Sequence, residues 1–195
     1  MAEIRLGPDA NEDSGRRRRV PRPLDPARLE EIALAYVARF ATSATKLERY
    51  LKRKLRERGW EGEREPDTSA LVLRFVEKGY LDDEAFARAR SGSLLRRGYG
   101  PRRIGQALSE AGVDQAIRED IRPGEAAARG AALAYARKRR FGPFGTRPAD
   151  PAAREKQIAA MLRAGHTLDS ARNLVDASSV ELAEQWAAEL EDDET

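Results

Sequence analysis

The sequence contains no cysteine, a single histidine and no long apolar run among its 195 residues. The absence of cysteine excludes a disulfide scaffold and thiol chemistry, and it suits a reducing cytoplasm. No apolar segment approaches the roughly 20 residues that a membrane-spanning helix needs. The N-terminus also lacks the apolar core of a secretory signal. We therefore expect a cytoplasmic protein that does not enter a membrane.

Residues suited to catalysis are also scarce. The one histidine, His166, stands where the repeats described below have bulky packing residues, which indicates packing rather than acid–base chemistry. Asp82, Asp83 and Glu84 could suggest a metal site, but neighbouring positions on a helix diverge and no histidine or cysteine lies nearby in sequence. No Walker-type phosphate-binding loop is present. The sequence predicts a protein that is not an enzyme and has neither catalytic residues nor a metal or other cofactor.

A helix that ends in glycine followed by a bulky residue occurs three times. The pairs are Gly59-Trp60, Gly112-Val113 and Gly165-His166, and successive glycines are 53 residues apart. Five of the six positions that lie eight and four residues before these glycines are apolar, as in an amphipathic helix. A period of about 50 residues is typical of helical arrays, whose short units stabilise one another by stacking.

We therefore predict an all-α fold, an elongated tandem array of three three-helix repeats. Around the middle repeat, Asp82 is a candidate N-cap, Gly98 ends a helix, and Pro101 fits the first turn of the next one. The predicted segments are a disordered basic N-terminal tail at 1–25, repeats at 26–78, 79–123 and 124–177, and an acidic C-terminal helix and tail at 178–195.

Apolar periodicity predicts which side chains these helices bury. In the first helix, near 26–41, the apolar positions are Leu29, Ile32, Ala33, Tyr36 and Phe40. In the helix after Asp67 they are Leu71, Val72, Phe75 and Val76, and in the tail helix, near 179–190, they are Leu182, Trp186 and Leu190. We expect Phe141 and Phe144, which lie in a loop of glycines and prolines, to pack against the core.

Charge is distributed unevenly along the chain, although the formal net charge is only +3. Residues 176–195 contain eight acidic residues and no lysine or arginine. The other 175 residues therefore hold 36 basic and 25 acidic side chains, a net charge of +11. A basic body predicts an acidic or polyanionic partner. A capping helix is the simpler interpretation of the acidic end, and the alternative hypothesis is that it folds over the basic surface and competes with the partner.

The most informative basic surface lies on the predicted helix at 44–58. Its apolar residues fall on one face, and Arg49, Lys52, Arg53 and Arg56 fall on the opposite one. No acidic residue stands among those four positions, so we do not expect ion pairs within the helix to explain them. Residues 88–103 add six arginines and no acid. The candidate partner-binding residues are Arg49, Lys52, Arg53, Arg56, Arg88, Arg90, Arg96, Arg97, Arg102 and Arg103. The alternative interpretation is an ordinary solvated helix face.

The central residues resemble a known family. Gly79-Tyr80-Leu81-Asp82-Asp83-Glu84, then Arg97-Gly98-Tyr99-Gly100-Pro101-Arg102-Arg103-Ile104, and then Gly112-Val113 look like the central signature of RecX proteins. The helix that ends in Arg53-Lys54-Leu55 is similar to the family's first-repeat motif. The resemblance covers roughly residues 27–175 and is most specific in the middle of the chain.

The resemblance implies an elongated, curved array of three-helix repeats that binds the bacterial recombinase RecA. It implies lodging in the groove of the RecA–DNA filament, restraint of ATP hydrolysis and strand exchange, and a role in recombinational DNA repair and the SOS response. Contact with single- or double-stranded DNA is also implied. We expect a monomer. The competing hypothesis is a stand-alone nucleic-acid-binding protein, because three-helix units with a basic second or third helix also describe helix-turn-helix readers. The basic stripe lacks the Asn, Gln or Ser side chains that read base edges, which favours contact with the phosphate backbone or with a protein.

Overall fold

The computed structural model describes residues 22–147 and 150–190. These residues form ten α-helices and one short 3-10 helix, η1 (Gly142–Phe144). The α-helices are α1 (Pro26–Arg39), α2 (Ala44–Arg58), α3 (Thr68–Glu77), α4 (Asp83–Arg96), α5 (Pro101–Glu110), α6 (Gln115–Asp120), α7 (Glu125–Arg139), α8 (Pro151–Arg163), α9 (Leu168–Val175) and α10 (Val180–Ala188). The predicted all-α array is confirmed. Most of the predicted disordered tail at 1–25 lies outside the described residues, but the prediction is wrong at its end, because Leu24 is buried in repeat 1 and its backbone is hydrogen-bonded to Gly59 and Glu61.

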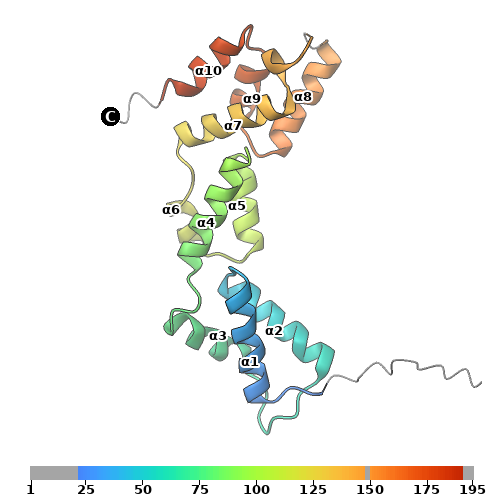
Figure 1. Ribbon diagram of the computed structural model, residues 1–195, viewed down its shortest axis with the longest axis vertical. Coiled ribbons are helices and arrows are strands. Elements are labelled where there is room, and N and C mark those ends of the chain that lie inside the picture. The colour runs from blue at the N-terminus through green and yellow to red at the C-terminus, as the bar shows by residue number, and fades with distance from the viewer. Residues whose placement is uncertain (1–21, 148–149, 191–195) are drawn as a thin grey trace, which may run out of the picture.

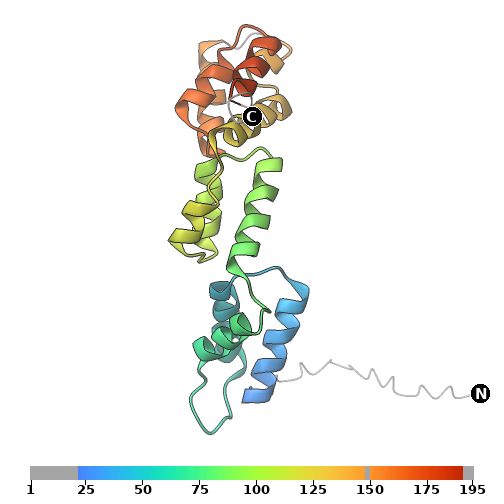
Figure 2. The same ribbon diagram turned by 90° about the vertical axis from the view of Figure 1, so that its left-hand side faces the viewer.

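The helices form three groups that follow one another along the long axis (Figure 1). Repeat 1 contains α1–α3, repeat 2 contains α4–α6, and repeat 3 contains α7–α9 with α10 packed on it. Each repeat has its own cluster of buried apolar side chains. Figure 2, at right angles to the first view, shows the same succession from bottom to top. The molecule is therefore an elongated stack of small cores rather than one large core.

Repeat 1 forms because its helix starts are capped and its apolar stripes face one another. Asp25, Ser43 and Asp67 occupy the three N-cap positions, and each side chain accepts a hydrogen bond from the first turn of its helix. The buried side chains from the three helices are Leu29, Ala33, Leu47, Leu51, Leu71, Val72 and Phe75. Capping and burial therefore agree on where these helices begin and how they pack.

Two side chains that the periodicity assigns to this core are exposed instead. Phe40 is 52% exposed, because α1 ends at Arg39 and residue 40 has an extended backbone that leaves the helical face. Val76 is 43% exposed, because the buried face of α3 is centred on Leu71 and Phe75 and Val76 falls at its edge. A change of backbone direction and a narrow buried face thus account for these errors.

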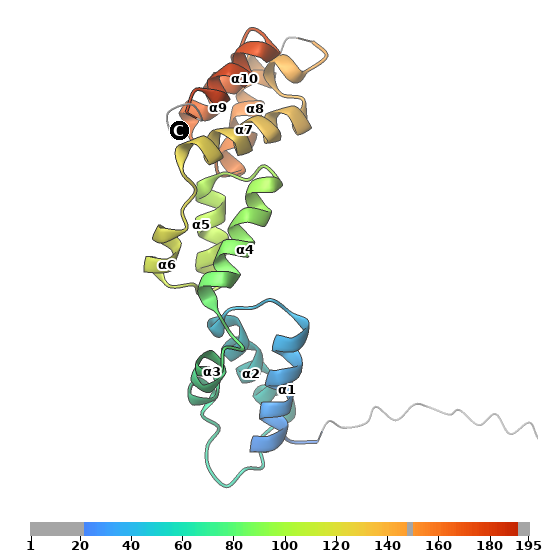
Figure 3. The same ribbon diagram turned by 60° about the vertical axis from the view of Figure 1, so that its left-hand side comes forward.

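Repeat 2 follows the predicted start and stop signals. Asp82 caps α4, and Pro101 occupies the first turn of α5. Gly98 has a φ of 81°, a left-handed conformation that suits glycine at the end of a helix. The core residues are Ala87, Leu94, Ile104, Leu108, Ala111 and Val113. Figure 3 shows the short helix α6 beside α4 and α5, with which it is in contact.

Repeat 3 has a core of small and aliphatic residues. The buried members are Ala132, Ala136, Ile158, Met161, Ala171, Leu174, Val175 and Ala183. Phe141, just before η1, and Phe144, its last residue, pack against this cluster as predicted, and both are partly buried. The amide of Gly142 between them donates a hydrogen bond of 2.8 Å to the Gln157 side chain on α8. The glycine-rich loop is thus fixed to the body of the repeat.

The repeats are joined end to end through their second helices. Across the first joint, the carbonyl oxygen of Ala111 accepts a hydrogen bond of 2.5 Å from Ser43, and that of Gly112 accepts one of 3.1 Å from Thr45. The corresponding residues 53 positions later, Ala164 and Gly165, accept from the backbone amides of repeat 2. The C-terminal end of each second helix thus meets the N-terminal end of the preceding one, so the three helix dipoles are arranged head to tail.

The tail helix packs differently from the prediction. Helix α10 buries Ala183 and Ala187, while Leu182 is 51% exposed. Its partner helix α7 presents alanines to the same cluster, and small side chains on both helices allow a close approach that large ones would prevent. Trp186 is partly buried, with the guanidinium of Arg129 at 4.7 Å from the ring centroid.

The acidic residues of this region pair with arginines of repeat 3. Glu184 binds Arg137, and Glu189 lies 3.3 Å from Arg129. In Figure 1, α10 lies at the opposite end of the molecule from α2. The hypothesis that the acidic segment covers the basic stripe of α2 is therefore wrong for the described residues 176–190, because local pairing and packing on α7 hold them in repeat 3.

Candidate partner-binding surface

The basic stripe predicted on α2 is exposed along its whole length. Burial of Leu47 and Leu51 in the core of repeat 1 turns the opposite face of the helix toward solvent. All four candidates on that face are exposed: Arg49, Lys52, Arg53 and Arg56. At the edge of the stripe, Tyr50 stacks on Tyr36 with ring centroids 4.2 Å apart, and Arg53 lies over the Tyr50 ring at 5.6 Å. Aromatic packing therefore supports the middle of the stripe.

The expectation that ion pairs within the helix do not explain this stripe is wrong for two of its four residues, Lys52 and Arg53. Lys52 lies 2.7 Å from Glu48, and Arg53 lies 3.5 Å from Glu57, each four residues apart on α2. Glu57 also receives a hydrogen bond from Lys54, and this bond, together with the nearby charges of Arg53 and Arg56, lowers the pKa of its carboxyl group. The prediction considered only the four basic positions and omitted acids one turn away. Such exposed pairs contribute little to stability, so these cations remain available to a partner.

Arg49 has a structural partner across the first joint. Its guanidinium donates a hydrogen bond of 2.8 Å to the carbonyl oxygen of Glu110, in the last turn of α5. A cation beside that carbonyl also interacts favourably with the negative end of the α5 dipole. Arg49 therefore links repeats 1 and 2, whatever else it binds.

The six arginines of repeat 2 do not form one surface. Arg88 pairs with Glu84 one turn earlier and lies 3.7 Å from Asp120 on α6. The hydrogen bond with Glu84 raises the pKa of Arg88. Arg88 and Arg90 point to opposite sides of α4, because two residues correspond to about 200° on a helix. Within the described chain, no acidic residue pairs with the other five, which are all exposed: Arg90, Arg96, Arg97, Arg102 and Arg103.

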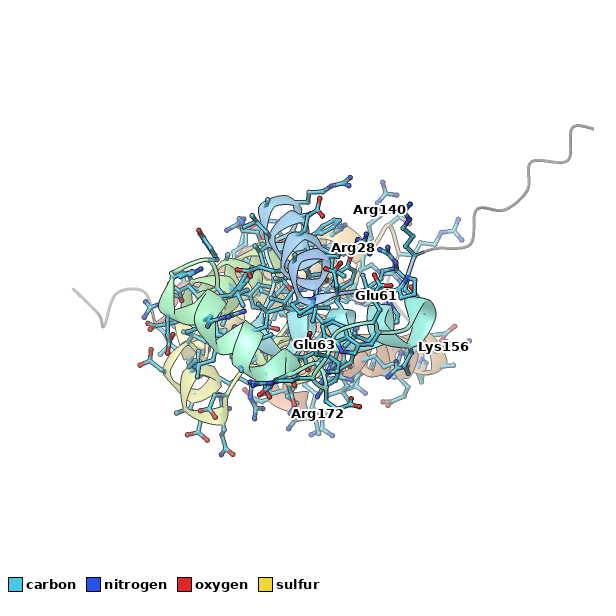
Figure 4. All side chains as sticks on the ribbon, turned by 90° about the horizontal axis from the view of Figure 1, so that it is seen from below. Arg28, Glu61, Glu63, Arg140, Lys156 and Arg172 are labelled. Atoms are coloured by element: carbon cyan, nitrogen blue, oxygen red, sulfur yellow. The ribbon has the colours of Figure 1, made fainter. Side chains whose placement is uncertain are left out.

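The structure also brings forward basic residues that the candidate set omitted. Arg97, at the end of α4, shares one pocket with Lys138 and Arg139 at the end of α7 and with Arg163 at the end of α8. The sequence pattern that could have indicated Lys138 and Arg139 is the run of four basic residues at 137–140. In a view along the long axis (Figure 4), Arg140 of this run and Lys156 of α8 lie on the same side as α2, whereas Arg172 lies apart.

The residues considered for chemistry have structural roles. His166 is 1% exposed, and its Nε2 lies 3.0 Å from the carbonyl oxygen of Gly98 in repeat 2. Burial lowers the pKa of His166, and the contact with Gly98 opposes that shift. The ring is then neutral at pH 7, so its Nε2–H donates to Gly98. Asp82 caps α4, and Asp83 accepts a hydrogen bond of 2.8 Å from the amide of Ala44 across the first joint.

Among residues 22–147 and 150–190, no three or more histidine, cysteine or acidic side chains lie where together they could hold a metal ion. Over the same residues, no helix combines the length and apolar character required to cross a bilayer. The features that the described chain does offer are therefore charged surfaces and rigid joints between repeats.

Comparison with known proteins identifies close relatives. A family described as "RecX, second three-helix domain" matches residues 82–120, which span α4 to α6. The chain is 34% identical over 187 residues to Regulatory protein RecX of Myxococcus xanthus, which covers 91% of this chain and 99% of that protein. It is 38% identical over 91 residues to Regulatory protein RecX of Thermus thermophilus, covering 47% of this chain and 61% of that protein.

Solved structures support the same fold. The crystal structure of RecX from Lactobacillus salivarius superposes with a TM-score of 0.61 at 18% sequence identity, covering 77% of this chain and 94% of that one. At this level of identity the likeness shows the architecture alone. The relatives found by sequence are named as regulatory proteins, in agreement with the prediction that the chain is not an enzyme.

Proposed function

This chain belongs to the RecX family, and from that premise we propose that it is a non-enzymatic regulator that binds the RecA–DNA filament. It inhibits RecA ATPase and strand exchange, and so acts in recombinational DNA repair and the SOS response. It does so in the cytoplasm and as a monomer. The elongated array of repeats supports the proposal, because an extended shape can contact more than one subunit of a helical filament.

The observation that carries the proposal is the set of exposed cations on repeats 1 and 2. A RecA–DNA filament offers both carboxylates and phosphates, and arginine binds either group with paired hydrogen bonds. Among the predicted candidates, those to which the described chain gives no ion pair are Arg49, Arg56, Arg90, Arg96, Arg97, Arg102 and Arg103, and all of them are exposed. Lys52 and Arg53 extend the surface, since their weak exposed pairs can be exchanged for those of a partner.

The test is to titrate the protein into RecA that hydrolyses ATP on single-stranded DNA, at two salt concentrations, and to measure DNA binding without RecA in parallel. We expect inhibition at protein concentrations well below those that coat the DNA. Inhibition that appears only when naked DNA is already saturated would overturn the proposal. Competition for phosphates would then suffice, and a stand-alone nucleic-acid-binding protein would replace the regulator.

A further inference from the structure

A basic pocket lies where repeat 2 meets repeat 3. It has a volume of about 310 Å³ and lies among the C-terminal ends of α4, α7 and α8. The lining residues are Arg97, Tyr99, Tyr135, Lys138, Arg139, Ala160, Arg163 and Ala164. Four of these eight are cationic and none is acidic. This composition differs from that of the α2 stripe, where Glu48 and Glu57 stand among the basic residues.

The four cations of the pocket have no ion-pair partner in the part of the chain that the structure describes. Other arginines of repeat 3 do have partners. Arg137 binds Glu184, and Arg154 lies 2.5 Å from Asp176, whose carboxyl pKa the hydrogen bond from Arg154 lowers. The acids of repeat 3 are thus engaged away from the pocket, and its positive charge stays uncompensated.

Helix dipoles account for only part of this charge. Each helix C-terminus carries about −0.5 of an elementary charge, so three ends supply about −1.5. Four side chains supply +4. Stabilisation of the three helix ends therefore explains the presence of some basic residues and leaves a surplus of roughly two to three positive charges that is available to an external anion.

The walls of the pocket are fixed by the joint between the repeats. Gly98 approaches the backbone of Tyr135 so closely that a Cβ atom on the glycine would lie 3.1 Å from the Tyr135 nitrogen. His166 lies against the Tyr135 ring, with centroids 5.6 Å apart, and binds Gly98. Arg97 lies over the Tyr99 ring at 5.3 Å. The helix ends that carry the cations are thus held in place by the joint before a ligand binds.

We propose that this pocket binds the phosphodiester backbone of DNA. Arginine forks match phosphate oxygens, and adjacent phosphates deliver closely spaced negative charges to a compact group of cations. The partly exposed tyrosine rings supply hydroxyl donors and a surface for bases, the combination that single-strand sites use. This site deepens the proposed function and rests on it, because the DNA bound in the pocket is the DNA within the RecA filament. The joint of repeats 2 and 3 then binds DNA rather than the recombinase.

The experiment compares two variants of the full chain that lose the same charge. The pocket variant is Lys138→Gln with Arg163→Gln, and the control is Arg64→Gln with Arg172→Gln, at exposed positions outside the pocket. Binding to labelled single-stranded and double-stranded DNA is measured from 50 to 200 mM salt without RecA, and RecA ATPase inhibition is measured separately. Circular dichroism and thermal melting establish that both variants are folded.

The pocket variant should lower the slope of log affinity against log salt by about 1.4 on single strands or about 1.8 on duplex DNA, since each phosphate contact contributes roughly 0.7 or 0.9. The DNA form, single-stranded or duplex, for which the pocket variant loses the larger fraction of its affinity is identified as the ligand. Equal slopes for pocket variant, control and unmodified protein would overturn the inference, as would competition by inorganic phosphate alone at millimolar concentration. Loss of RecA inhibition with unchanged DNA binding would also overturn it and would assign the pocket to the recombinase. Failure of the proposed function would appear instead as absent inhibition by the unmodified protein.

Discussion

Gly100 and Gly165 meet directly across the joint between repeats 2 and 3, where a Cβ atom on Gly100 would lie 2.4 Å from the carbonyl carbon of Gly165. The Gly100 amide donates a hydrogen bond of 2.9 Å to Ala164 at the same place. The backbone of Gly100 is extended, with a φ of −80°, which any residue can adopt. Glycine is required here because the two backbones approach each other too closely for a side chain. The first joint has a similar contact, since a Cβ atom on Gly112 would lie 2.4 Å from Thr45.

Gly100→Ala should lower the free energy of unfolding by about 1–3 kcal/mol, because the added methyl group meets backbone that cannot move aside. Urea denaturation measures the change. Gly105→Ala, on the same helix, is the matched control: no atom lies within 4 Å of the new Cβ, so this variant should be more stable by about 0.5–1 kcal/mol through helix propensity. Equal effects of the two substitutions would show that the joint is not tightly packed.

Ser43→Ala should cost more than an ordinary N-cap substitution. The Ser43 hydroxyl caps α2 and also donates to the buried carbonyl of Ala111 across the joint. Loss of a cap costs about 1 kcal/mol, and an unpaired buried carbonyl adds about 1–3 kcal/mol. Ser179→Ala is the control, because Ser179 caps α10 and, within the described residues, its side chain makes no hydrogen bond to another repeat. If chemical denaturation gives the same loss for both variants, the bond to Ala111 contributes nothing.

The stability of the protein should fall as the pH drops below about 6.5. Burial lowers the pKa of His166 in the folded state, so the unfolded chain binds more protons below its own pKa of about 6.5. The contribution is fully present above that value and is lost progressively until the folded pKa is reached, at up to about 1.4 kcal/mol per pH unit. Urea titrations at pH 7.5 and 5.5 should show a smaller difference for His166→Gln than for the unmodified protein. An equal difference would assign the pH dependence to other groups.

Neutralising Arg53 and Arg56 to glutamine should raise the concentration for half-inhibition of RecA ATPase about tenfold, since truncating an important interface arginine commonly costs more than 1 kcal/mol. Helix content should not change, because both side chains are exposed on α2. The control is Arg74→Gln with Lys78→Gln, which removes the same charge from α3 beside Glu30. Inhibition that weakens equally in both variants would indicate a general effect of net charge.

Removing residues 180–195 should destabilise repeat 3 rather than strengthen binding to a partner. The described part of this segment packs Ala183 and Ala187 on α7 and pairs Glu184 with Arg137. We expect a lower melting temperature and unchanged inhibition per folded molecule, measured by calorimetry and the RecA ATPase assay. Stronger inhibition by a fully stable truncated protein would revive the competition hypothesis.

Local signals in the sequence predicted most helix ends correctly. Asp82, Gly98 and Pro101 act through the backbone within one or two turns, so their effect does not depend on distant residues. The glycines at 59, 112 and 165, spaced at 53 residues, all have positive φ and end equivalent helices. The predicted burial was wrong where the chain leaves a helix, as at Phe40, and where two helices pack through alanines instead of large apolar side chains, as in α10.

The candidate surface was predictable only in part. All ten basic candidates are exposed, and for the four on α2 this exposure follows from helical periodicity. Their partners do not, because Arg49 finds Glu110 across a joint, and Arg88 finds Asp120 on another helix. Whether these candidates bind the partner remains a prediction.

The sequence by itself determined the all-α class, the three repeats, their helix caps and the excess of positive charge, since each depends on residue type and short spacing. Only the tertiary structure decided how the repeats join and which charges meet. Arg97, Lys138 and Arg163 lie far apart in sequence and share a pocket because three helix ends converge there. Convergence of this kind depends on packing between repeats, and no pattern within a single helix encodes it.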